Sequence, residues 1–378
     1  MRASATTLRV VVGPAVRRAS AETRHIARAH SRLDRYARAR GVVMTKAAAA
    51  GGADEPATTA SAATTASGET NDAKRVKRDV NRNARELGVT GKRAFTVKHG
   101  GLLMTSEGVY GDLKLNEAAQ KVKGVRVRQH VNPLSSKFQV QAPSPQWREV
   151  YEDVMKPLTI DIGCAGGRFD LLLAKRQPER NVLGVDIREP LVERGLSWGE
   201  ASGIVGNIHF ATCNATVSIG EWVKSYHALG GEVALVTILH PDPHFKSKHK
   251  KRRIVQKGLV EQLAREMHPG TRVYLQSDVE ELTEDMREKF ERYCDGCFDL
   301  DPELHDVDAA RAKAEAVKDE PLEDPDAEDD GWRSTWVHGG WLSENPLGVP
   351  SERELQTLGE GLPVFRVMLR RTEKKCEI

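Results

Sequence analysis

The chain has 378 residues, of which 39% are hydrophobic and 29% are charged, and its formal net charge is +3. This length allows one domain of ordinary size together with long tails. No apolar run approaches the roughly 18–20 residues that a membrane helix needs, so we expect no membrane-spanning segment. Five cysteines do not indicate a disulfide scaffold. Cys294 and Cys297 form a single CxxC without a second pair or suitably spaced histidines, so no metal site is expected.

The net charge hides a strong asymmetry along the chain. Residues 1–50 carry eleven Lys or Arg and only two acids, whereas residues 299–330 carry fourteen acids and three bases. A dense basic run extends from Lys246 to Arg253. These local clusters therefore carry more information than the average charge.

The first part of the chain is biased in composition. Residues 1–46 are rich in Arg, Ala and Ser and poor in acids, which is typical of an organellar transit peptide; a basic tail without structure is the alternative. Residues 47–72 are of low complexity and cannot form a core. Residues 73–156 form a basic N-terminal extension. We therefore expect a disordered N-terminal region before the folded domain.

From residue 157 onward, short apolar runs alternate with helical stretches. This alternation indicates βαβ units and an α/β fold with a Rossmann-like, doubly wound and mostly parallel sheet over residues 157–378. Residues 299–345 interrupt the pattern as an acidic insertion with three tryptophans. The predicted strands span residues 158–162, 182–185, 208–211, 233–239, 272–276 and 363–369, and the predicted helices span residues 168–176, 190–202, 218–228, 251–267 and 279–292.

A glycine-rich turn follows the first predicted strand. Asp161 and Gly163–Gly167 lie at the carboxyl end of that strand, and Asp186 ends the second, where an acid can bind a ribose diol. A dinucleotide site favours G-x-G-x-x-G, whereas Ala165 stands at the third position of this turn. S-adenosylmethionine carries no phosphate but has a positive sulfonium and an amine, which Asp161 would favour. An ordinary tight turn remains the structural alternative.

Two further polar positions follow predicted strands. Asn214 comes after the third strand, where it would either bind an adenine or cap the next helix. Asp242 follows the apolar fourth strand between two prolines, which deny it helix geometry. The basic run that follows at once indicates a nucleic-acid partner, with phosphates held by lysines and arginines and a base facing Asp242. The alternative is a solvated basic helix with a structural Asp-Pro turn.

Six segments together resemble the tRNA (guanine-N7)-methyltransferase family, and most of all its plant and algal organellar members. The similarity covers the chain from about residue 125 to the end, and RVRQHVNPL (126–134) resembles the family's N-terminal extension. The segments are DIGCAGGRF (161–169), GVDIR (184–188), NAT (214–216), PDPHFKSKHKKRR (241–253), QSD (276–278) and NPLGVPSERE (345–354).

The resemblance implies a fold, a reaction and a set of site residues. The fold would be the seven-stranded class I S-adenosylmethionine-dependent methyltransferase fold, and the reaction would be methylation of the variable-loop guanine of tRNA, guanine(46), at N7. Asp242 would be the catalytic acid. The cofactor would contact Asp161, Gly163, Asp186, Asn214, Ala215 and Leu239, and the tRNA would contact Lys246, Asp278, Ser351 and Glu354.

The partner and the compartment are also implied by the resemblance. Nuclear eukaryotic members work with a WD-repeat subunit, whereas bacterial members act alone, and the transit-like leader favours the self-sufficient kind. The plastid stroma is the expected location, with the mitochondrion as the alternative. Two competing functions remain: methylation of another RNA, or RNA binding without catalysis on the same fold.

Overall fold

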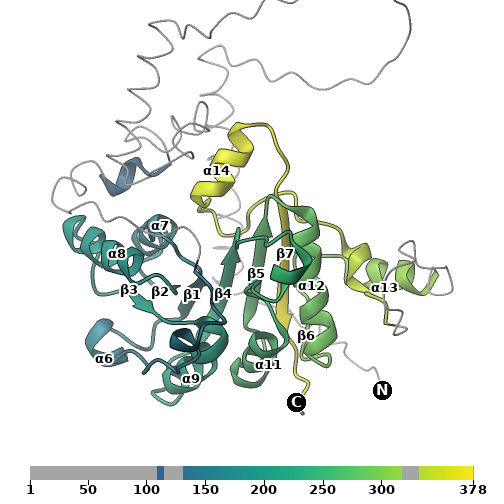
Figure 1. Ribbon diagram of the computed structural model, residues 1–378, viewed down its shortest axis with the longest axis horizontal. Coiled ribbons are helices and arrows are strands. Elements are labelled where there is room, and N and C mark those ends of the chain that lie inside the picture. Colours follow the sequence, from purple (N-terminus) through teal and green to yellow (C-terminus); the bar gives the residue numbers. More distant parts are fainter. Residues whose placement is uncertain (1–108, 115–130, 317–331, 378) are drawn as a thin grey trace, which may run out of the picture. The chain divides into compact units, whose positions relative to one another are not determined.

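The computed structural model describes residues 109–114, 131–316 and 332–377. Its centre is a seven-stranded sheet with the strand order β3-β2-β1-β4-β5-β7-β6 (Figure 1). The first five strands are parallel, while β7 pairs antiparallel with both β5 and β6. The strands are β1 (Leu158–Ile162), β2 (Asn181–Asp186), β3 (Ile208–Thr212), β4 (Val233–Leu239), β5 (Arg272–Ser277), β6 (Phe298–Leu300) and β7 (Phe365–Arg371).

Helices cover both faces of this sheet and create two large hydrophobic clusters, beside a small third one of Leu235, Tyr274 and Met368. The larger cluster joins the sheet to α6 (Trp147–Val150), α9 (Ala215–His227), α11 (Lys257–Glu266) and α12 (Glu280–Tyr293). The second joins it to α7 (Arg168–Arg176) and α8 (Glu189–Ala201). Residues along β1, β2 and β4 are buried almost throughout and most of them are apolar, so both faces of these central strands are covered, as is typical of parallel sheets. The doubly wound α/β fold expected from the sequence is therefore confirmed.

Most predicted elements agree with the structure to within a few residues, but three regions differ. The predicted helix 251–267 is wrong at its start: α10 (Ser247–Lys250) is a separate short helix, and α11 begins at Lys257. The predicted elements did not include β6, a strand of only three residues, or α14 (Glu352–Gly359). Within the predicted insertion, α13 (Val307–Ala316) and the 3-10 turn η3 (Trp336–Gly339) are ordered and pack against each other.

Residues before 157 also contribute to the core. The Trp147 and Tyr226 rings pack edge to face with centroids 5.1 Å apart, and Tyr151 is buried beside them. The turn η1 (Gly111–Leu113) packs on α7, where Tyr110 and Leu113 are buried. The predicted transit peptide and low-complexity linker lie outside the described residues. Within the described residues, no helix is long and apolar enough to cross a membrane.

Candidate active site

A tight glycine turn connects β1 to α7 at the carboxyl ends of the parallel strands. The Gly163 amide donates a hydrogen bond to the carbonyl of Val185 over 2.7 Å, and its φ of 94° lies in the left-handed region. A Cβ at Gly163 would meet no atom within 4 Å, whereas a Cβ at Gly167 would lie 2.3 Å from the Phe210 ring. Gly163 therefore leaves open space above the strand end, while Gly167 is required for packing.

Asp161 is a buried carboxylate beneath this turn. It is 3% exposed, and its Oδ1 accepts a hydrogen bond of 2.6 Å from the Thr237 hydroxyl on the neighbouring strand β4. Burial raises the pKa of Asp161 to about 7, and the negative charge of Asp186 adds to this, although the Thr237 hydrogen bond acts in the opposite direction. A buried acid whose charge is this poorly compensated fits a positively charged ligand group such as an ammonium.

Asp186 ends β2 and is held by Arg188. Its Oδ1 accepts from Arg188 Nε at 2.8 Å and its Oδ2 from Arg188 Nη2 at 2.7 Å, while the Ala165 amide of the glycine turn donates to Oδ2 at 3.1 Å. Although burial lowers the pKa of Arg188, its hydrogen bonds to Asp186 and the charges of Asp186 and Asp242 raise it above the usual value. The charge of Asp242 thus acts on the same guanidinium that covers Asp186.

Asn214 is the N-cap of α9. Its Oδ1 accepts from the Thr216 amide at 3.3 Å and from the Thr216 hydroxyl at 2.8 Å. Its Nδ2 donates to the carbonyls of Phe138, at 3.0 Å, and Pro133, at 3.3 Å. The capping role is therefore present, and the side chain also anchors residues 133–138. Ala215 follows as the first residue of α9 and is buried, while Leu239 is the half-buried last residue of β4.

The Asp242 loop, residues 240–244, follows β4 directly. Asp242 is exposed, and two left-handed residues bracket it: His240 with a φ of 48° and His244 with a φ of 44°. Such backbone is rarely adopted by residues other than glycine, and it occurs preferentially at functional sites. The loop therefore has a specific shape that its tertiary contacts must maintain.

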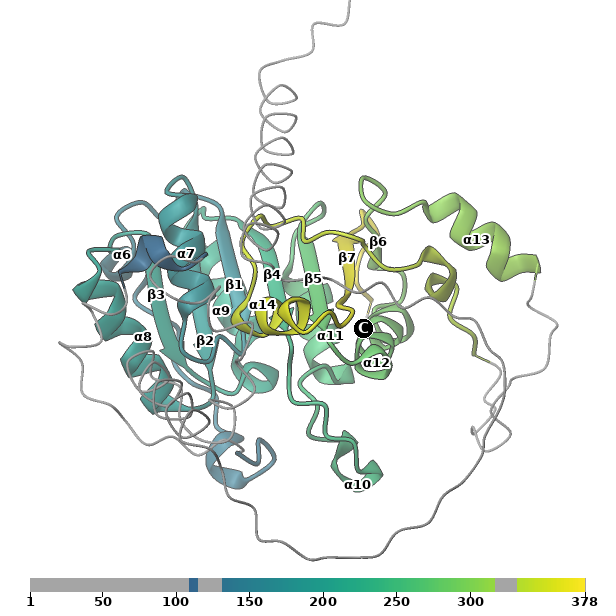
Figure 2. The same cartoon turned by 90° about the horizontal axis from the view of Figure 1, so that it is seen from above.

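The basic run after this loop has two parts with different roles. Lys246, Lys248 and Lys251 are exposed, and α10 lies on a loop that projects from the body of the sheet (Figure 2). Arg253, however, is only 3% exposed and donates through Nε to the carbonyl of Pro243 over 2.8 Å. The expectation that the whole run faces phosphate is therefore wrong for Arg253, whose guanidinium supports the loop. Lys250 also forms an ion pair, with Glu281 at 3.2 Å.

Asp278, just after β5, links this loop to α14. Its Oδ1 contacts His240 Nδ1 at 3.1 Å, and its Oδ2 accepts from Arg353 Nε at 2.9 Å. Burial alone would raise the pKa of Asp278, but the hydrogen bonds from His240 and Arg353 hold it well below its usual value. Asp278 is therefore ionised at neutral pH. Figure 1 shows α14 beyond the ends of β4 and β5, in agreement with this contact.

Ser351 and Glu354 form a capping box at the start of α14. The Ser351 hydroxyl accepts from the Glu354 amide at 3.2 Å, and Glu354 Oε2 accepts from the Ser351 amide at 3.3 Å. Glu354 is 1% exposed and also accepts from Arg366 at 2.8 Å and from Asn345 at 2.7 Å. Both side chains are thus engaged within the protein, and the sequence held a signal for this in S-x-x-E, which is the capping-box spacing.

Two other features lie outside this site. Cys294 and Cys297 are buried near β6, where burial raises the pKa of both thiols, and no group of residues suited to a metal occurs in the described ranges.

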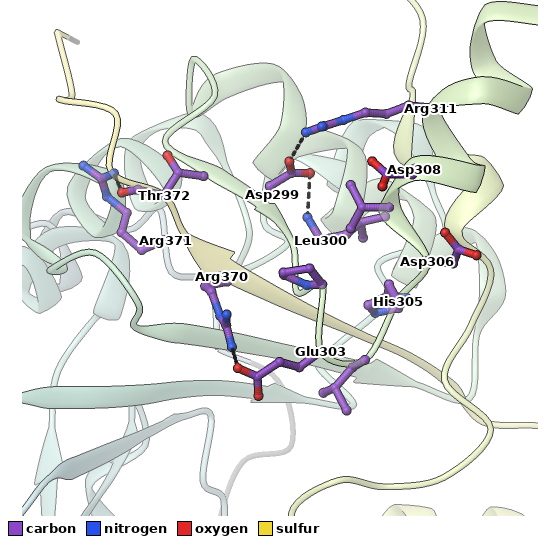
Figure 3. A pocket seen from close by; sticks show the side chains of 13 residues that line it. Asp299, Leu300, Glu303, His305, Asp306, Asp308, Arg311, Arg370, Arg371 and Thr372 are labelled. Atoms are coloured by element: carbon purple, nitrogen blue, oxygen red, sulfur yellow. Dashed lines mark hydrogen bonds and ion pairs between the residues drawn. The ribbon is translucent and has the colours of Figure 1, made fainter. Parts of the chain in front are cut away.

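A pocket of about 700 Å³ lies beside β6 and β7 (Figure 3). Its Arg370 and Glu303 are paired with each other, as are Arg311 and Asp299. Three strands separate β6 from β1 in the sheet, so this pocket is remote from the glycine turn.

The strand order, the antiparallel β7 and the acids at the ends of β1 and β2 beside a glycine turn define a class I S-adenosylmethionine-dependent methyltransferase. A family model described as "Putative methyltransferase" matches residues 155–315. The chain is 40% identical over 252 residues to a tRNA (guanine-N(7)-)-methyltransferase of a Synechococcus strain, covering 67% of this chain and 87% of that protein. The protein of the same name from Synechocystis is 39% identical over 248 residues, covering 66% and 98%. The chain belongs to the tRNA (guanine-N(7)-)-methyltransferase family.

Proposed function

We propose that this protein transfers the methyl group of S-adenosylmethionine to N7 of the variable-loop guanine of tRNA, guanine(46). The observation that carries the proposal is the position of Asp242, which stands directly after β4 in a loop bracketed by two residues with left-handed backbone. Its negative charge, like that of Asp186 at the end of β2, raises the pKa of Arg188. Membership of the family supplies the substrate class, and the exposed lysines beside the loop suit an RNA backbone.

The cofactor would lie across the ends of β1, β2 and β4. Asp161 would receive the ammonium of its amino-acid end, and the open space above Gly163 would allow the close approach of the cofactor. Asp186 would accept from the ribose diol once Arg188 moves aside. The adenine would contact the segment around Asn214, Ala215 and Leu239. Because the Asn214 side chain already caps α9, its backbone rather than its amide would serve the adenine.

The guanine needs positioning more than activation. N7 is an unprotonated acceptor, so no base is required to make it nucleophilic, and alignment with the methyl group should dominate catalysis. A carboxylate can hold the base by accepting from N1–H and the exocyclic amine. Of the two candidates, Glu354 has both oxygens occupied by Arg366, Asn345 and Ser351, which favours Asp242. Asp278 would contact the tRNA only if it released Arg353 or His240, and Ser351 would act through its position at the start of α14.

Nucleoside mass spectrometry tests the proposal. The purified protein should form 7-methylguanosine in tRNA that lacks this modification, and Asp242→Asn should abolish turnover while S-adenosylhomocysteine still binds with unchanged affinity. A product found only in ribosomal RNA would indicate another RNA methyltransferase. Cofactor binding without any methylated nucleoside would indicate an RNA-binding protein on the same fold. A fully active Asp242→Asn enzyme would refute the role of this acid.

We further propose that the protein acts in the plastid, without a WD-repeat subunit. The cyanobacterial relatives and the Arg-, Ala- and Ser-rich residues 1–46 support this location. Residues 1–46 fused to a fluorescent protein should direct it to plastids, and a mitochondrial signal would favour the other organelle. Methylation by the purified chain alone would agree with self-sufficiency, and a strict need for a second subunit would oppose it.

A further inference from the structure

Two non-glycine residues in left-handed conformation bracket Pro241–Asp242–Pro243. His240 has a φ of 48° and His244 a φ of 44°, and each conformation costs free energy relative to ordinary backbone. The two prolines fix their own φ angles, so the direction of Asp242 depends mainly on the residues at either side. Contacts outside the loop must therefore compensate for the cost at His240.

The His240 ring has such contacts on both nitrogen atoms. Its side chain is 5% exposed, with Nδ1 3.1 Å from Asp278 Oδ1 and Nε2 2.8 Å from Gln276 Nε2. Since the ionised Asp278 only accepts hydrogen bonds, Nδ1 carries the proton and Nε2 accepts from the Gln276 amide. The side-chain oxygen Oε1 of Gln276 in turn accepts from the Tyr274 hydroxyl at 2.6 Å. Every donor in this series meets an acceptor, which fixes both the tautomer and the orientation of the ring.

The loop is also held through its backbone at both ends. The main-chain amide of His240 donates to the main-chain carbonyl of Gln276 over 2.7 Å, and the buried Arg253 side chain donates to the main-chain carbonyl of Pro243 over 2.8 Å. Arg353 of α14 holds the other oxygen of Asp278. His240 thus connects the end of β4 to β5 and, through Asp278, to α14, while the basic segment contacts the other end of the loop at Pro243.

We propose that His240 is a positioning residue for methyl transfer: its imidazole, locked between Gln276 and Asp278, maintains the left-handed backbone that points Asp242 at the guanine. This inference rests on the proposed function. His240 does not touch the guanine or the cofactor and acts only by holding the backbone on which Asp242 stands. Loss of the ring should therefore lower kcat for tRNA methylation and leave cofactor binding intact.

Three substitutions separate the ring from the backbone. His240→Ala removes both hydrogen bonds and disfavours positive φ, and His240→Gly removes the bonds but accepts positive φ freely. Both should lower kcat by about tenfold or more, since a misplacement of about 1 Å can cost up to about a hundredfold in rate. His240→Asn tolerates positive φ and still offers an amide to Asp278, so it should stay within about threefold of wild type. His338→Ala, on η3, is the matched control and should leave kcat unchanged.

Additional measurements exclude a merely structural effect. The Kd for S-adenosylhomocysteine should stay within about twofold of wild type in all three variants, because no cofactor-binding group changes. In an Asp242→Glu background, which already displaces the carboxylate, His240→Ala should cause little further loss, because the two changes affect the same alignment.

The outcomes keep the two proposals apart. Wild-type kcat in His240→Ala or His240→Gly would overturn the positioning role. It would also be overturned if the loss of kcat in the double variant equalled the product of the losses in His240→Ala and Asp242→Glu alone. If His240→Ala does not fold, the glycine and asparagine variants decide. The proposed function fails instead if the wild-type protein does not methylate tRNA or if Asp242→Asn remains active, whatever the His240 variants do.

Discussion

The guanidinium of Arg188 lies across the carboxylate of Asp186, with Nε 2.8 Å from Oδ1 and Nη2 2.7 Å from Oδ2. The Arg188 amide donates to the same Oδ1 at 2.9 Å. The carboxylate oxygens of Asp186 that would accept hydrogen bonds from a ribose diol therefore already accept them from protein groups. If the ribose diol binds Asp186 as proposed, it must replace the Arg188 side chain, whose guanidinium also experiences the negative charge of Asp242.

This exchange predicts opposite effects of two neighbouring substitutions. Asp186→Asn should weaken S-adenosylhomocysteine binding by about tenfold or more, equivalent to at least ~1.4 kcal/mol, because the amide accepts less strongly from the diol. Arg188→Met should bind at least as tightly as wild type, because no side chain must be displaced. Isothermal titration calorimetry measures both. A tenfold weaker Arg188→Met variant would mean that Arg188 itself contacts the cofactor.

The raised pKa of Asp161 predicts that protein stability and cofactor affinity change with pH in opposite directions. Because burial raises this pKa from 3.8 to about 7, the folded protein without cofactor binds a proton that the unfolded chain has lost. This contribution to stability is complete below about pH 4 and is lost as the pH rises through about 7. The cofactor's ammonium prefers the ionised acid, so cofactor affinity should instead increase over the same range.

Asp161→Asn separates these two effects. The variant should weaken cofactor binding and flatten its pH profile between pH 5 and 8, and it should reduce the loss of melting temperature across that range. Asp170, whose pKa burial also raises, would account for the slope that remains. Unchanged pH profiles for both binding and melting temperature in Asp161→Asn would contradict the assignment.

Gly163 and Gly167 offer a matched pair of alanine substitutions. Both have positive φ, so each variant carries a backbone cost of about 1–2 kcal/mol. Gly167→Ala adds a clash with Phe210 at 2.3 Å and should lower the melting temperature strongly. Gly163→Ala meets no protein atom, so it should fold with a smaller loss but bind S-adenosylhomocysteine poorly. Thermal denaturation with and without ligand distinguishes the two, and normal ligand binding by Gly163→Ala would show that the cofactor does not pass there.

We expect Glu354 to contribute mainly to the stability of the folded protein and not to direct contact with the substrate. Its side chain and that of Arg366 are 2% and 6% exposed and form an ion pair at 2.8 Å. Glu354→Ala should cost about 3–5 kcal/mol in the free energy of unfolding, because Arg366 would remain buried without its partner. Glu360→Ala, at the exposed end of the same helix, should cost less than about 0.5 kcal/mol. Chemical denaturation measures both, and a Glu354→Ala variant of wild-type stability but low activity would restore a direct substrate role.

Local sequence determined where the chemistry-bearing residues lie along the chain. The apolar runs of β1 and β4 and the glycine turn indicated a doubly wound sheet because buried parallel strands need continuous apolar sequence. Helix α7 agrees with its predicted bounds, since its periodic pattern is bounded by a glycine turn and by Pro178 shortly after its end. The position of Asp242 between two prolines was likewise evident from the sequence alone.

Only the tertiary structure decided which partner each polar side chain has. The charges of Lys246–Arg253 look alike in sequence, yet Arg253 is buried against Pro243 because the chain turns back on the loop there. Glu354 pairs with Arg366 and Asp278 pairs with His240, and in both pairs the residues are distant in the chain. Strand β6, which pairs with β7, is too short to leave a periodic pattern in the sequence. Hydrogen bonds depend on distance and direction in space, and a linear pattern of residue types does not contain either.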